Sequence, residues 1–149
     1  MRIVIDTNLL IDAALDEYHF ANRILDEVLE GKIEAFANRA TIRENELMAG
    51  KKISDEKHLG KVRQIFGMIK PAPDIEERIR VISDRQDNKL LESAITSGSE
   101  YLITSDKEVL KVGEYQGVKI VTPKEFWAIY EDEKGDSWEK WVESFISNK

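Results

Sequence analysis

The sequence contains no cysteine and only two histidines, His19 and His58. The lack of cysteine excludes disulfides and thiolate metal sites, and two histidines disfavour a histidine-rich zinc site. No apolar run approaches the roughly 20 residues that a bilayer-spanning helix needs. The first residues do not have the pattern of a signal peptide. We therefore expect a cytoplasmic protein that does not enter a membrane.

An excess of positive charge is also missing. The chain has 22 Lys and Arg against 29 Asp and Glu, a net charge of −7. This balance argues against a broad basic face that wraps nucleic acid, but it allows a nucleic-acid enzyme with a carboxylate-rich metal site. Basic residues are concentrated between positions 51 and 70. Five of them could contact phosphates, or could simply form a solvated helix face: Lys51, Lys52, Lys57, Lys61 and Arg63.

Hydrophobic spacing predicts alternating strands and helices. Apolar runs predict strands at 2–5, 34–37, 101–104 and 118–121. Helical spacing and capping residues predict helices over about 20–31, 41–48, 54–69 and 87–98, with another beginning at Thr122-Pro123, while residues 74–83 fit either helix or an extended segment. This alternation is typical of an α/β domain in which helices cover both faces of a parallel sheet.

The last residues differ from the rest of the chain. We expect one domain over residues 1–131 and an acidic, helical C-terminal extension over residues 132–149. The extension has one apolar stripe at helical spacing, formed by Trp138, Trp141, Val142, Phe145 and Ile146. Such a stripe packs either on its own domain or on a partner.

Four acidic residues are expected at one edge of the sheet. Asp6 ends the first strand, Glu44 lies in the helix after the second, and Asp87 and Asp106 lie on either side of the strand at 101–104. The carboxyl ends of parallel strands share one edge, so these side chains can converge. Converging carboxylates repel one another unless a cation neutralises them, and Mg²⁺ or Mn²⁺ prefers such oxygen ligands. Such a site can activate water for phosphodiester hydrolysis.

Each of these acids also has a purely structural interpretation. Asp6 could form a turn with its own backbone, and Glu44 has capping-box spacing from Thr41. Asp87 and Asp106 could be acids at helix N-termini. The occurrence of all four in this chain order favours a shared metal site. Glu46 lies two positions from Glu44 and is an alternative to it, although the two face opposite sides of a helix.

Several motifs resemble one known family. They are Val4-Ile5-Asp6-Thr7-Asn8 and the stretches at 43–47, 87–91, 98–107 and 117–126. With these motifs the chain resembles PIN-domain ribonucleases, especially those that are toxins of toxin–antitoxin pairs. The resemblance implies a three-layer α/β/α sandwich around a mostly parallel sheet of about five strands.

The resemblance also implies an activity and its residues. It implies Mg²⁺- or Mn²⁺-dependent endonucleolytic cleavage of single-stranded RNA by a homodimer that a cognate antitoxin holds inactive. Asp6, Glu44, Asp87 and Asp106 then take the metal-binding, catalytic positions. Asn8 and Thr104 are supporting polar residues, and Asp84 is a further candidate ligand.

Other functions remain open from the sequence. A PIN-like domain can bind RNA or protein without cutting, and housekeeping RNA-processing nucleases share the fold. A receiver-like signalling domain is disfavoured because Thr7 and Asn8, rather than a second acid, follow Asp6. A haloacid-dehalogenase-type phosphatase would need an Asp where Asn8 stands.

Overall fold

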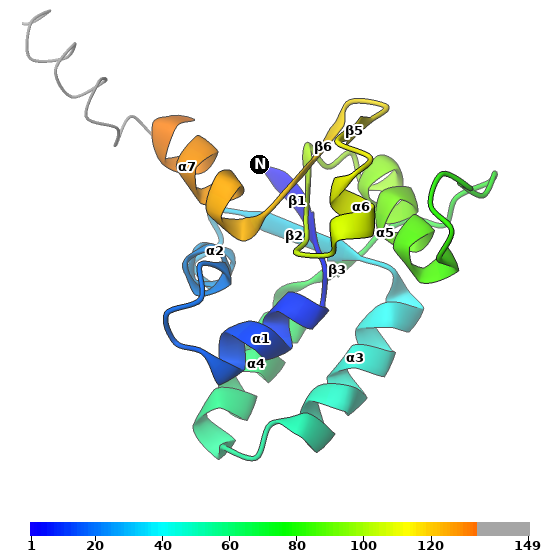
Figure 1. Ribbon diagram of the computed structural model, residues 1–149. Coiled ribbons are helices and arrows are strands. Elements are labelled where there is room, and N and C mark those ends of the chain that lie inside the picture. Colours follow the sequence, from blue (N-terminus) through cyan, green and yellow to red (C-terminus); the bar gives the residue numbers. More distant parts are fainter. Residues whose placement is uncertain (134–149) are drawn as a thin grey trace, which may run out of the picture.

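A computed structural model describes residues 1–133 as an α/β domain built on one central sheet (Figure 1). The strands are β1 (Arg2–Ile5), β2 (Glu34–Ala37), β3 (Lys70–Pro71), β4 (Tyr101–Ile103), β5 (Glu114–Tyr115) and β6 (Val118–Val121). The helices are α1 (Asn8–Leu15), α2 (Ala21–Leu29), α3 (Arg39–Lys52), α4 (Glu56–Met68), α5 (Arg85–Thr96), α6 (Lys107–Leu110) and α7 (Pro123–Glu133). The expected extension lies mostly outside these residues.

The sheet is mostly parallel, as the sequence predicts. Its six strands lie in the order β3-β2-β1-β4-β6-β5, and only β5 is antiparallel to its neighbour β6. In the centre, Ile5 of β1 is in register with Ile103 of β4. The carboxyl ends of the two most central strands therefore lie side by side, which places Asp6 next to Thr104.

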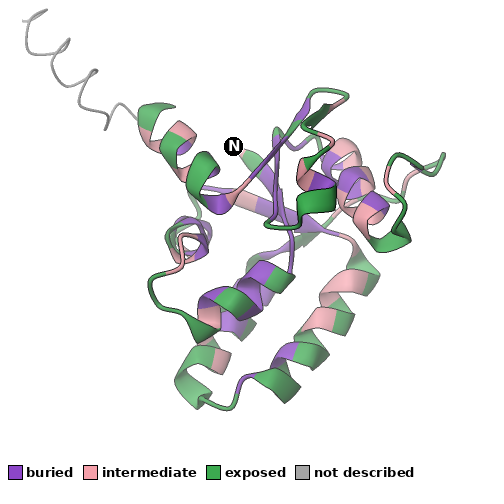
Figure 2. Ribbon diagram, viewed as in Figure 1, coloured by how far each residue is buried: buried purple, intermediate pink, exposed green. Residues whose placement is uncertain are grey.

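Two apolar layers cover the sheet, and this confirms the predicted three-layer sandwich (Figure 2). Successive side chains of a strand point to opposite faces. Ile3 and Ile5 pack with α1, α2, α4 and α7, whereas Val4 packs with α5 and α6. The strands therefore have nearly continuous apolar sequences, because helices bury both faces.

Several element boundaries differ from those expected. Helix α3 begins at Arg39 and continues through Gly50 to Lys52, so the predicted end near residue 48 is wrong. Helix α4 begins at Glu56 rather than at residue 54, because Asp55 caps it and its carboxylate accepts hydrogen bonds from Lys57 N and His58 N. Helix α1 and strands β3 and β5 were not expected. Each of the two strands has only two residues, which is too short for a recognisable pattern.

The ambiguous segment is a loop without regular structure over residues 72–84. It is fastened to α5 by the side chain of Asn88, which is 7% exposed. Asn88 Oδ1 accepts from the amides of Val81 and Ile82, and its Nδ2 donates to the carbonyls of Ile82 and Asp84. This amide thus fixes the loop against the helix that carries Asp87.

Among the helices described here, none combines the length and apolar character needed to cross a bilayer.

Candidate active site

Asp6 occupies the carboxyl end of β1, where it is held from both sides. Its amide donates to the carbonyl of Ile103 at 2.9 Å, which continues the pairing of β1 with β4 past Ile5. Oδ1 accepts from the amide of Asn8 at 3.1 Å, and Oδ2 accepts from the Thr104 hydroxyl at 2.9 Å. Only 9% of Asp6 is exposed. The carboxylate is therefore held in one orientation at the central edge of the sheet.

Thr104 connects Asp6 to Asp106. It directly follows β4 and is fully buried. While its hydroxyl donates to Asp6, the same oxygen accepts from the amide of Asp106 at 3.1 Å. Asp106 is exposed and caps α6, where its Oδ1 accepts from Glu108 N at 2.9 Å. Thr104 therefore supports Asp6 structurally through a buried hydrogen bond, and its predicted part in the function stays a prediction.

A cavity of about 310 Å³ opens over Asp6, and we call it the acidic pocket. Asn8, Glu44 and Asp87 line it together with Asp6. Three of the four predicted acids thus share one cavity, although they come from β1, α3 and α5. Glu46 is absent from its lining, which favours Glu44 as the acid of α3.

The acids of this edge influence one another electrostatically. Burial, followed by the charges of Asp106 and Asp84, raises the pKa of Asp87 to about 6. Burial also raises the pKa of Asp6, with a further contribution from Asp106, against the opposing effect of the hydrogen bonds from Asn8 and Thr104. Asp106 is therefore close enough to act on both carboxylates without lining the pocket.

The donor chemistry of this edge fits a divalent cation. The ligands are carboxylates, which Mg²⁺ and Mn²⁺ prefer. Within residues 1–133, no salt bridge joins Asp6, Glu44, Asp87 or Asp106 to a lysine or arginine. As arranged, however, no three acidic or histidine side chains of residues 1–133 stand close enough together to hold one ion. The chemistry of a cation site is present, but a preformed cage is not.

The remaining predicted residues do not line the acidic pocket. Asp84 caps α5, where its Oδ1 accepts from Gln86 N at 2.7 Å. The five predicted RNA contacts are absent from the lining of the acidic pocket: Lys51, Lys52, Lys57, Lys61 and Arg63. Sequence reasoning also missed Asn88 and Lys89, of which Lys89 lines the pocket. Both residues lie in the motif at 87–91 that carries the family resemblance, directly after Asp87, and this was the signal that pointed to them.

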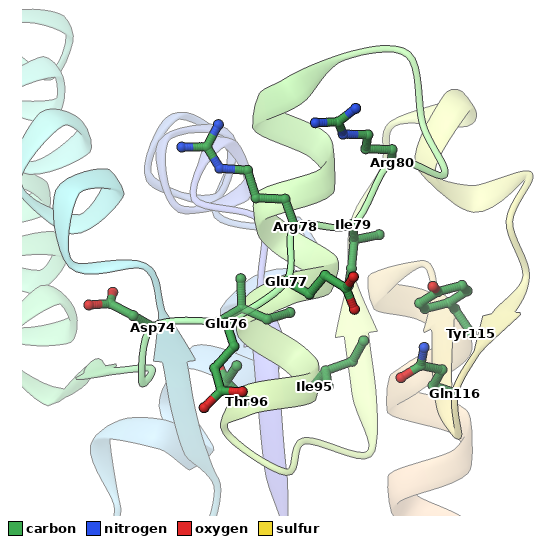
Figure 3. Close-up of a pocket in the computed structure, with 11 residues that line it drawn as sticks. Asp74, Glu76, Glu77, Arg78, Ile79, Arg80, Ile95, Thr96, Tyr115 and Gln116 are labelled. Atoms are coloured by element: carbon green, nitrogen blue, oxygen red, sulfur yellow. The ribbon is translucent and has the colours of Figure 1, made fainter.

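A hollow larger than the acidic pocket lies away from these acids (Figure 3). Its volume is about 970 Å³, and the loop at 74–80 forms one wall. Ile95 and Thr96 line it at the end of α5 that precedes β4. It therefore opens towards the amino ends of the strands, whereas Asp6 lies at their carboxyl ends. Its loop wall mixes three acids with two arginines, so it does not show the concentration of one charge seen in the acidic pocket.

Comparison with known proteins identifies the family. The PIN domain model matches residues 2–108, which include all four acids. The chain belongs to the PIN domain family. PIN domains are generally nucleases, so the acidic pocket lies in a nuclease-type fold.

Two individual proteins are similar to this PIN domain. The uncharacterized protein MJ1680 of Methanocaldococcus jannaschii is 25% identical over 139 residues, which cover 85% of this chain and 89% of that protein. The crystal structure of PAE2754 from Pyrobaculum aerophilum superposes with a TM-score of 0.51 at 18% identity, covering 80% of this chain and 92% of the other. The second likeness concerns the fold alone.

Proposed function

We propose that this PIN domain is a Mg²⁺- or Mn²⁺-dependent endoribonuclease that cleaves single-stranded RNA in the acidic pocket. The observation that carries the proposal is the convergence of Asp6, Glu44 and Asp87 on one cavity, next to Asp106. Separate structural roles for these acids would not require a common cavity. The absence of a salt bridge to any of them within residues 1–133 leaves their charge for a cation.

The residues divide into fixed and adjustable ligands. Asp6 is buried and held by two hydrogen bonds, so it is the fixed point of the site. Glu44 and Asp106 are exposed, and their side chains have room to turn towards a cation. Asp87 lies between these extremes. We propose that cation binding draws the exposed carboxylates towards Asp6, which would account for the lack of a preformed cage.

When bound, a divalent cation would supply the positive charge that polarises the scissile phosphodiester and activates a water. The chain's own part is to place the carboxylates and to orient Asp6. The hydrogen bonds from Asn8 and Thr104 lower the pKa of Asp6 and so oppose the effect of burial. Thr104 and Asn8 therefore favour the ionised form of Asp6 against the larger effect of burial, and they orient its carboxylate for ligation.

The test is cleavage of a pool of structured and unstructured RNAs by the purified chain. Parallel reactions contain Mg²⁺, Mn²⁺ or EDTA. We expect fragments with either cation and none with EDTA. Equal cleavage in EDTA would contradict metal dependence. If no sample yields fragments and calorimetry detects no Mn²⁺ binding, the non-catalytic module is the better interpretation.

The sequence resemblance is the basis for a proposal about the biological role. We propose, on that resemblance, that the chain is the toxin of a toxin–antitoxin pair and forms a homodimer. A housekeeping RNA-processing role is the alternative. Co-expression with the product of a small neighbouring gene separates the two, because a toxin is expected to arrest growth alone and to be neutralised by that product.

A further inference from the structure

Two more cavities adjoin the acidic pocket. Their volumes are about 570 and 230 Å³, and we call the two together the trough. Asn38 and Lys89 line the acidic pocket and both cavities of the trough. Glu44 lines the acidic pocket and the larger cavity. These shared walls make the trough a continuation of the acidic pocket.

The trough has a cationic lining that comes from two distant parts of the chain. The start of α3 forms one wall, and the loop at 73–78 with the start of α5 forms the other. The basic residues that line it are Arg39, Arg43, Arg78, Arg85 and Lys89. Arg39 and Arg43 are four positions apart, so they share one face of α3.

Acidic residues only partly balance these charges. The acids of the trough are Asp74, Glu44 and Glu92, three against five basic residues. One carboxylate oxygen of Glu92 accepts from the amide of Ile79 at 3.0 Å, so this acid also holds the loop. In a chain with a net charge of −7, this is a local excess of positive charge.

The basic residues of the trough are not engaged in salt bridges. Within residues 1–133, none of the five pairs with a carboxylate. By contrast, Lys61 pairs with Asp26 at 3.0 Å and Lys70 with Glu34 at 3.4 Å. Figure 3 shows Arg78 extending from the loop away from Tyr115 and Gln116, which line the large hollow. The charges of the trough are therefore available to an anionic ligand.

We infer that the trough binds the sugar–phosphate backbone of the RNA strand that is cut in the acidic pocket. This inference rests on the proposed function for the choice of RNA. Lys89, at the junction of the three cavities, contacts the phosphate next to the scissile one. Arg39 and Arg43 contact phosphates further along the strand. Carboxylates alone repel a polyanion, and an adjoining row of cations offsets that repulsion.

The basic residues of the trough take the place of the phosphate contacts expected from the sequence. Those five residues, Lys51, Lys52, Lys57, Lys61 and Arg63, are absent from the lining of the trough as well. Lys51 and Lys52 lie at the far end of the helix that starts with Arg39 (Figure 1). They provide a matched control, because their removal takes the same charge from the same helix.

The experiment measures RNA binding separately from cleavage. The 149-residue chain carrying Asp6→Asn is titrated into a fluorescein-labelled single-stranded RNA in EDTA, and anisotropy is followed at several KCl concentrations. The test variants in this background are Arg39→Gln/Arg43→Gln and Lys89→Gln. Lys51→Gln/Lys52→Gln is the control, and Arg39→Lys/Arg43→Lys tests whether charge alone restores binding. Thermal melting confirms that each variant is folded.

We expect Arg39→Gln/Arg43→Gln to weaken binding about tenfold and to lower the salt slope by about 0.7 for each phosphate that the variant no longer neutralises. Lys89→Gln should act in the same direction, and the lysine pair should recover most of the affinity. The control should change the affinity less than about twofold. Equal loss in the control and trough variants, or no loss in the trough variants, would overturn the inference.

The outcomes separate this inference from the proposed function. If the wild-type chain cuts RNA but the trough and control variants bind alike, the trough inference fails and the nuclease stands. If the trough variants alone lose binding and the wild-type chain does not cut, the nuclease proposal fails and the trough is the RNA-binding surface of a non-catalytic domain.

Discussion

The hydroxyl of Thr104 donates a 2.9 Å hydrogen bond to Oδ2 of Asp6, although the two residues are 98 positions apart. The bond joins the carboxyl ends of β1 and β4, and it is completely buried. It exists because Ile5 and Ile103 are in register in adjacent parallel strands. The orientation of the central acid of the pocket thus depends on the pairing of the two central strands.

Thr104→Val should disturb this arrangement while keeping the side-chain shape. It removes the hydrogen bond to Asp6 and the acceptor of the Asp106 amide. We expect a loss of about 1–3 kcal/mol in the free energy of unfolding, because buried polar groups lose partners. Urea denaturation measures the loss, and Thr104→Ser is the control that keeps the hydroxyl. A valine variant as stable as the wild type would contradict this role.

The pKa of Asp87 predicts a pH dependence of stability in the absence of metal. Its folded-state pKa of about 6 lies above the ordinary value of 3.8, so folding favours the neutral form. This contribution is complete below about pH 4 and is lost as the pH rises through about 6. The melting temperature of the wild type in EDTA should therefore fall relative to Asp87→Asn across this range. If the difference in melting temperature between the wild type and Asp87→Asn stays constant with pH, the pKa of Asp87 is not raised.

Asn88 should control the loop at 72–84. Asn88→Leu removes four hydrogen bonds to the loop and to the start of α5. We expect faster proteolysis within residues 72–84 and a loss of about 1–3 kcal/mol in stability. Asn88→Asp is the control, because a carboxylate can still accept from Val81 and Ile82 although it cannot donate. Unchanged proteolysis in the leucine variant would exclude this anchoring role.

Phe126 tests whether the segment after the family match is part of the same core. The match ends at residue 108, but Phe126 of α7 is fully buried. Its ring packs edge-to-face on Tyr101 of β4 at 5.4 Å and stacks on Tyr130 at 5.9 Å. Phe126→Ala should cost about 3–5 kcal/mol in the free energy of unfolding, as in other aromatic cores.

Lys124→Ala is the control for this substitution, because Lys124 is exposed on the same helix. We expect each variant to unfold in a single cooperative transition. Only Phe126→Ala should shift the midpoint of that transition to a lower urea concentration. A loss below about 1 kcal/mol for Phe126→Ala would mean that α7 packs more loosely than the structure shows.

The sequence was sufficient to predict the central part of the fold. The four longest strands carry apolar runs that both sheet faces require, and chain order then places Asp6 and Asp106 at one edge. Strands β3 and β5 have two residues each, which is too few for a periodic signal. Pro71 also disguises β3, which lies at the edge of the sheet where proline is tolerated.

Tertiary contacts determine the parts that sequence reasoning missed. In the sequence, Asn88 looks like an ordinary helix residue. Its side-chain amide is buried because the loop before α5 folds back over it, and Ile82 N donates to its Oδ1. The basic residues at 51–63 form a conspicuous run in the sequence, but the direction of α3 carries Lys51 and Lys52 away from the pocket. Arg39, Arg78 and Lys89 are scattered along the chain and gather only on folding.

The most direct test of the central claim is the cleavage rate of one single-stranded RNA by the wild type and by Asp6→Asn at saturating Mn²⁺. Asp12→Asn is the matched control, since Asp12 is an exposed acid on α1 whose charge also reaches Asp6. We predict that Asp6→Asn remains folded but cuts at least about 100-fold more slowly, while Asp12→Asn stays within about threefold of the wild type. Cleavage by folded Asp6→Asn at a rate close to that of the wild type would contradict a carboxylate-centred nuclease site.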